Sequence, residues 1–159
     1  MQIADYHLTY CTNIHPGESW DATFENLKEY IPKIKGELSV TEAFAIGLRV
    51  SDEASKTLIK PERLAEFKSW LKDNNCYVFT FNGFPFGGFH RQVVKDEVHF
   101  PDWSSTARKD YTLRLFKILA TIMPANMDAG ISTSPLSYKH WHKSTEAMKA
   151  LMDQSCAHI

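Results

Sequence analysis

The segment YVFTF at residues 77–81 is the clearest β-strand in this sequence, because all five of its residues are aromatic or β-branched. Working outward from it, three more short runs with strand character lie near residues 6–12, 44–48 and 129–133. Longer segments with helical spacing separate the four runs. This alternation is typical of repeated β/α units and predicts an α/β fold with a parallel sheet.

The segments between the strands predict helices. In the first, apolar residues recur at spacings of four and three residues, Ser19 is placed to cap the start, and Pro32 should kink or end the helix. A short helical turn is expected near 51–58, and Pro61 suits the first position of the next helix. Further helices are expected over 106–123 and 141–154.

Four β/α units in a row amount to half of an eight-stranded β/α barrel of the TIM type. We therefore expect residues 1–159 to form the amino-terminal half of one such barrel. An open half would leave two unpaired strand edges and one bare sheet face, which another chain or missing sequence would have to cover. Strand spacing alone does not exclude a small doubly wound sheet with helices on both faces.

Composition narrows the classes of partner. The formal net charge is −1, so nucleic-acid binding would need a local basic patch, and none is evident. Three widely spaced cysteines fit reduced thiols. The first residues lack a signal-peptide pattern, and no run of about 18 apolar residues suits a membrane span. We expect a cytoplasmic protein that binds neither nucleic acid nor membranes.

The stretch 82–105 is too long and too rich in glycine, proline and aromatic residues to be a simple connector. In a β/α barrel, polar residues just after each strand point into the mouth of the active site. Amide and imidazole groups suit sugar hydroxyls, and arginine and lysine suit phosphate. The candidate substrate-binding residues are His15, Arg49, Asn82, His90, Ser134 and Lys139, with Asn13, Arg91, Lys95, Tyr138 and His140 nearby.

Several candidates have plainer interpretations. His15 precedes Pro16 and could sit in an exposed turn, and Asn82 before Gly83 could supply turn geometry. For Arg49 the plain alternative is a structural ion pair with Asp52 or Glu53, which follow the same strand.

Six motifs taken together resemble a known family. They are HLTYCTNIHPGESW from His7, FAIGLRVS from Phe44, YVFTFNGFPFGGFH from Tyr77, FPDW from Phe100, DYTLRL from Asp110 and ISTSPLSYK from Ile131. In order and spacing they resemble the amino-terminal half of the EboE-type metabolite traffic proteins. That group belongs to the xylose-isomerase-like barrel superfamily of sugar phosphate isomerases, epimerases and endonuclease IV.

The resemblance implies a ligand pocket at the carboxyl ends of the strands, in a protein about twice this length or more. It also implies a divalent metal, Mn²⁺, Zn²⁺ or Mg²⁺, with acidic ligands largely from later strands outside this chain. Two functions follow from the resemblance. One is a metal-dependent sugar or sugar phosphate isomerase or epimerase; the other is a non-catalytic protein that carries a metabolite intermediate for export. Either version needs a homo-oligomer or the missing half of the barrel.

Overall fold

The computed structural model of the chain describes residues 2–38, 41–88 and 95–158. At its centre is a four-stranded sheet in which every pair of neighbouring strands is parallel and the spatial order follows the chain. The strands are β3 (Thr9–Cys11), β4 (Phe44–Arg49), β5 (Cys76–Asn82) and β6 (Gly130–Ser132). The predicted α/β class with a parallel sheet is confirmed.

The strand predicted over 6–12 is divided in the structure. Its first part, β2 (Tyr6–His7), pairs with β1 (Gln2–Ile3) in a separate antiparallel hairpin, and only Thr9–Cys11 joins the parallel sheet. The hairpin turns at Ala4, which has a φ of 52°. The aromatic and β-branched residues of this run correctly predicted extended structure. They did not show that its two parts pair in two different sheets.

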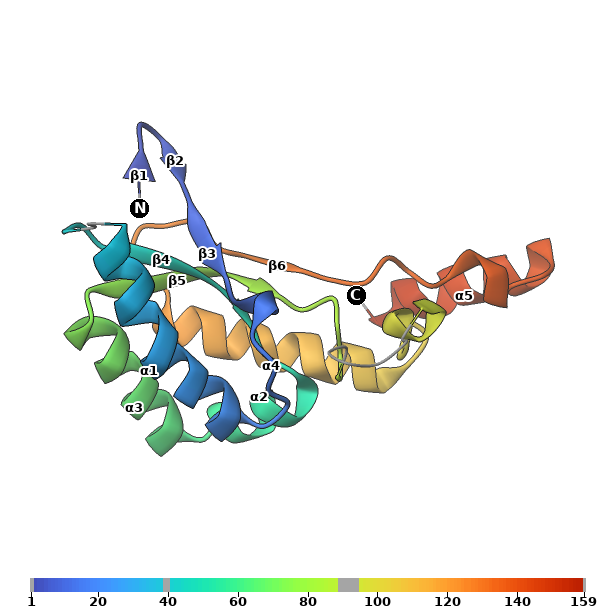
Figure 1. Cartoon of the computed structure of the whole chain (residues 1–159). Coiled ribbons are helices and arrows are strands. Elements are labelled where there is room, and N and C mark those ends of the chain that lie inside the picture. Colours follow the sequence, from blue (N-terminus) through green and yellow to red (C-terminus); the bar gives the residue numbers. More distant parts are fainter. Residues whose placement is uncertain (1, 39–40, 89–94, 159) are drawn as a thin grey trace.

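Four helices lie together on one face of the sheet (Figure 1): α1 (Trp20–Glu37), α2 (Asp52–Leu58), α3 (Pro61–Asp73) and α4 (Thr106–Ile122). Ser19 caps α1 as predicted, its hydroxyl accepting a hydrogen bond from the amide of Ala22 at 3.2 Å. Of the two outcomes expected at Pro32, the helix does not end there, since α1 continues to Glu37. Buried apolar residues of the strands and of all four helices form one core between the two layers.

This arrangement differs from a doubly wound sheet. In that fold the strand order reverses at a switch point and helices cover both faces. Here the order does not reverse, and no helix of the described residues covers the second face (Figure 1). We refer to this second face as the open face.

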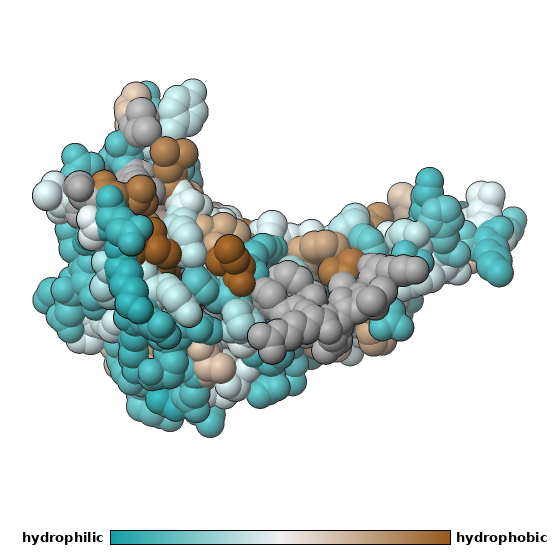
Figure 2. Space-filling model, viewed as in Figure 1, coloured by the Kyte–Doolittle hydropathy of each residue, from teal (hydrophilic) through white to brown (hydrophobic). Residues whose placement is uncertain are grey.

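The helix after β6 does not continue the layer. Helix α5 (Thr145–His158) lies beyond the carboxyl ends of the strands, near the short helix η2 (Lys95–His99), so the fourth unit lacks a helix packed on its strand (Figure 1). The space-filling view shows this part as an arm projecting from a body whose visible face is mainly hydrophilic (Figure 2). Among the described residues, no helix has both the length and the apolar character needed to cross a membrane.

The strand register sorts the open face into rows. Thr9, Ala45 and Tyr77 are neighbours in the row nearest the amino ends of the strands. The next row contains the small or short residues Cys11, Gly47, Thr80 and Gly130. The last row, at the carboxyl ends of the strands, contains the polar residues Arg49, Asn82 and Ser132.

Candidate functional site

The polar row of Arg49, Asn82 and Ser132 is the part of the sheet best placed to meet a ligand. Arg49 is paired with Asn82, and Asn82 with Ser132, across three adjacent strands. Because paired residues of parallel strands point to the same face, the three side chains leave the sheet on the open face at its carboxyl edge. Arg49 and Asn82 are two of the predicted substrate-binding residues, and the structure places them side by side at this edge.

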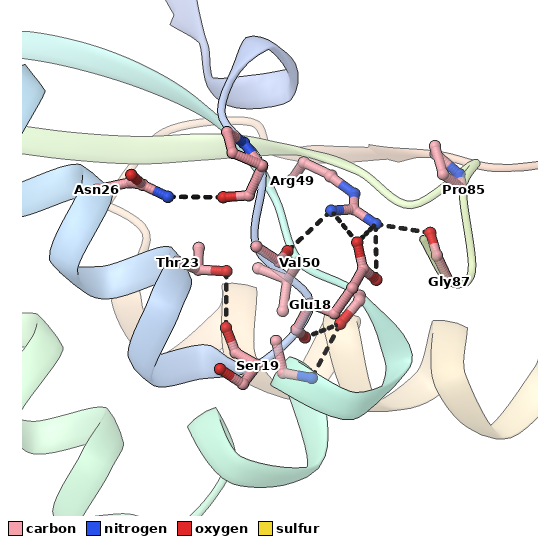
Figure 3. Close-up of polar contacts among 12 residues, drawn as sticks. Glu18, Ser19, Thr23, Asn26, Arg49, Val50, Pro85 and Gly87 are labelled. Atoms are coloured by element: carbon pink, nitrogen blue, oxygen red, sulfur yellow. Dashed lines mark hydrogen bonds and ion pairs between the residues drawn. The ribbon is translucent and has the colours of Figure 1, made fainter. Parts of the chain in front are cut away.

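Within the row, Arg49 is engaged in structural contacts (Figure 3). Its Nη2 lies 3.1 and 3.2 Å from the two carboxylate oxygens of Glu18 and donates to the carbonyl oxygen of Gly87 at 2.6 Å. Its Nη1 donates to the carbonyl of Gly17 at 3.0 Å. The side chain is 3% exposed. The guanidinium thus joins the loops that follow β3 and β5 to the end of β4.

Arg49 therefore pairs with Glu18 and not with Asp52 or Glu53, the partners that the sequence suggested. Asp52 instead pairs with Arg114 of α4 and Lys56, both at 2.5 Å. Glu18 lies 31 residues before Arg49, and no local pattern points to their contact.

Asn82 and Ser132 form the accessible part of the row. The Asn82 Oδ1 accepts hydrogen bonds from the Ser132 hydroxyl at 3.0 Å and from the backbone amide of Phe84 at 3.2 Å. The second bond is the turn geometry that the sequence allowed for an Asn before Gly83. The Asn82 Nδ2 has no hydrogen-bond partner within the described parts of the chain, so the amide retains two donors for a ligand.

His15 is turned away from the open face. Its Nε2 lies 2.9 Å from the Tyr10 hydroxyl, and its ring stacks on Tyr30 of α1 with a centroid distance of 4.6 Å. Tyr10 is paired with Ile46, whose side chain belongs to the core on the helical face. The structure therefore places His15 with the helices and does not bring it to the polar row.

The remaining predicted residues lie beyond the polar row. Ser134 is 2% exposed, and its buried hydroxyl has no hydrogen-bond partner among the described residues. Lys139 is exposed at the start of the short helix η3 (Lys139–Trp141). His90 and Arg91 lie outside the described residues, and Lys95 begins η2.

A polar cluster of Asp102, Ser137 and His142 joins the loop after β6 to the loop that precedes α4. The hydroxyls of Ser104 and Ser137 donate to the Asp102 carboxylate, and the His142 Nε2 lies 2.8 Å from the Ser137 hydroxyl. Because the single hydrogen of Ser137 is directed to Asp102, the His142 Nε2 must carry the hydrogen between them. Ser137 is thus held as a donor to a carboxylate and is not activated as a nucleophile.

The pKa of Asp102 reflects these contacts. Burial opposes ionisation, but the hydrogen bonds from Ser104 and Ser137 and the nearby His142 outweigh it and hold the pKa below its ordinary value. Ser137 and His142 carried no spacing signal in the sequence, because they meet Asp102 only through tertiary structure.

Arg108 supports the loop after β5 from within the core. It is fully buried at the start of α4, and it donates to the carbonyl oxygens of Gly83, Phe84 and Pro101 at 2.8, 3.1 and 2.8 Å. Burial lowers the pKa of its guanidinium. Tyr111, one turn along, donates to the carbonyl of Val50 at 2.6 Å, so α4 fixes the loops after both β4 and β5.

The described residues contain no group of three or more His, Cys, Asp or Glu side chains placed to hold a metal ion. The chain matches no protein-family model, no curated protein and no solved structure.

Proposed function

We propose that this chain is the amino-terminal half of a xylose-isomerase-like β/α barrel and helps to bind a sugar or sugar phosphate at the carboxyl ends of its strands. The observation that carries the proposal is the polar row of Arg49, Asn82 and Ser132 on the open face of a parallel sheet whose strands follow chain order. In a β/α barrel this face becomes the interior, and this edge becomes the mouth of the pocket.

The layering of the sheet supports the half-barrel interpretation. Helices α1 to α4 occupy one face, as the outer ring of a barrel does (Figure 1). The edge strands β3 and β6 each have one neighbour within the sheet. The remaining strands would come from missing sequence or from a second copy of the chain, and would pair with these edges.

The flank of α4 beside β6 also supports the half-barrel interpretation. Arg114 and Thr121 of α4 contact α2 and α3, whereas Phe116 of the same helix is 51% exposed. Since helical residues sit 100° apart, Phe116 projects from the flank opposite Arg114. The next helix of a barrel ring would cover this apolar flank.

The chemistry of the row favours hydroxyl groups as its direct ligands. Asn82 has free donors, and the exposed Ser132 offers a hydroxyl, whereas the Arg49 charge is directed to Glu18. These groups suit a polyol. The motifs that resemble the EboE-type traffic proteins agree with a metabolite of this kind.

Turnover distinguishes the two candidate activities. A metal-dependent isomerase or epimerase would take its Mn²⁺, Zn²⁺ or Mg²⁺ ligands largely from the other half of the barrel. A metabolite carrier for export would bind the same ligand without converting it. Melting temperatures measured with each metal, followed by a test for interconversion of aldose and ketose, separate these two readings.

Calorimetric titration of the chain with fructose and with xylose tests ligand binding at the polar row. We expect saturable binding that weakens about tenfold in Ser132→Ala, which corresponds to the loss of one hydrogen bond of about 1.4 kcal/mol. Thr133→Ala, at the next exposed position, is the matched control. Equal binding by both variants would remove Ser132 from the site, and no binding of either sugar would overturn the proposed function.

A further inference from the structure

Four aromatic side chains contact one another in a series that begins near the polar row and ends at an exposed tryptophan. Phe84, two residues after Asn82, lies with its ring centroid 5.4 Å from that of His99. His99 stacks on Tyr138 at 5.1 Å with an interplanar angle of 14°, and Tyr138 meets Trp141 edge to face at 5.7 Å. We call Phe84, His99, Tyr138 and Trp141 the ring ladder.

The ladder is held in place by contacts between two loops. The backbone amide of Trp103 donates to the carbonyl of Leu136, and its indole Nε1 donates to the carbonyl of Ser134, both at 3.0 Å. The Ser137 hydroxyl donates to Asp102 on the same loop. These bonds fix the segment just before Tyr138, so a ligand would meet rings that are already ordered.

The outer end of the ladder combines an exposed ring with two lysines, while the Asp96 carboxylate interacts with the hydroxyl of Tyr138. Trp141 is 40% exposed, and Lys139, His140 and Lys143 around it are all exposed. Neither lysine forms an ion pair with a carboxylate of the described residues. Ammonium groups of this kind pair with phosphate, and an indole face packs on the C–H face of a sugar.

We propose that the ring ladder, with Lys139 and Lys143, forms a subsite for the phosphate-bearing end of a phosphorylated sugar. This inference rests on the proposed function and makes it narrower, because it assigns the phosphate to the turn after β6. Arg49, already paired with Glu18, is then not the phosphate ligand. Trp141 packs on the sugar, and the two lysines neutralise the phosphate.

The test uses the full chain and three probes: fructose 6-phosphate, fructose and inorganic phosphate. Binding is followed by calorimetry and by tryptophan fluorescence, with Trp141→Phe identifying the reporting indole. The test variant is Lys139→Ala with Lys143→Ala. Its matched control is Lys33→Ala with Lys117→Ala, which removes two exposed lysines from α1 and α4. Circular dichroism confirms that every variant is folded.

We expect fructose 6-phosphate to bind at least tenfold more tightly than fructose. The Lys139 and Lys143 variant should lose that advantage and leave fructose binding unchanged. Trp141→Ala should weaken both sugars. The subsite is overturned if inorganic phosphate binds as tightly as fructose 6-phosphate, if the control pair weakens binding equally, or if neither sugar binds at about 10 mM. Ser132-dependent binding of fructose with no preference for its phosphate would overturn this subsite and leave the proposed function standing.

Discussion

Glu18 and Arg49 form a bidentate ion pair at the carboxyl edge of the sheet, between the ends of β3 and β4. The Arg49 Nη2 contacts both carboxylate oxygens of Glu18, and Nη1 lies 3.1 Å from Oε1 (Figure 3). The guanidinium side chain is almost wholly buried, whereas Glu18 is 39% exposed. The pair therefore holds together the loops at the mouth of the proposed pocket. Removing the Glu18 carboxylate would leave the charge of Arg49 buried and without this partner.

Replacing Glu18 tests this organising role. We expect Glu18→Gln to lower the free energy of unfolding by about 1–3 kcal/mol, because the buried Arg49 loses its carboxylate. Urea unfolding measures the change. Glu29→Gln is the control, since its ion pair with Lys33 is exposed on both sides and should contribute less than about 0.5 kcal/mol. Equal effects of the two substitutions would contradict the role given to Glu18.

Arg108 should be the most sensitive arginine in the chain. In Arg108→Lys a single ammonium cannot reach the carbonyls of Gly83, Phe84 and Pro101 together, so we expect a loss of about 2–4 kcal/mol in the free energy of unfolding. Arg63→Lys alters a partly exposed arginine with ion pairs to Asp21 and Glu66, and it should change stability little. A small effect at Arg108 would show that its three bonds are replaceable by water.

Asp102 should make stability depend on acid pH. Its folded pKa is depressed, so its contribution is fully present above the unfolded value of about 3.9 and is lost as the pH falls through the lower folded value. The stability difference between the natural chain and Asp102→Asn should hence be constant from pH 7 to about 5 and shrink below about pH 4. Urea unfolding across this range measures it, and a difference that stays constant to pH 3 would be the contrary result.

The exposed flank of α4 should mediate association. Phe116→Lys replaces a half-exposed apolar side chain on this flank, and we expect the variant to remain folded and to self-associate less. Lys72→Glu on α3 is the control for a change of charge. Sedimentation velocity compares the species, and unchanged association in Phe116→Lys would place the contact elsewhere.

The regular part of the fold could be predicted from the sequence because its signals are local. Ser19 caps α1, Pro61 begins α3, and YVFTF lies within β5, as its β-branched and aromatic residues indicate. The division of residues 6–12 could not be predicted, because it depends on which strand each half pairs with. The placement of α5 away from the sheet depends likewise on tertiary contacts, including the bond from Gln154 to the Ser104 carbonyl.

The positions of Arg49 and Asn82 could be predicted from the sequence, but their partners could not. Asn82 and Arg49 end buried strands, so their place at the carboxyl edge follows from the β/α pattern. His15 follows a strand too, yet stacking on Tyr30 draws it to the helical face. Glu18, Ser137 and His142 were missed because their contacts join distant segments, and contacts of that kind leave no periodic pattern in a single sequence.

The central claim, that this chain is half of a barrel, is tested most directly by the mass of the chain in solution. Analytical ultracentrifugation from about 1 to 100 µM covers the range in which an interface of this kind assembles. We predict that the chain sediments with twice the mass of one chain or more, because the open face and the free strand edges need a covering half. A stable, folded monomer across the whole range would contradict the claim.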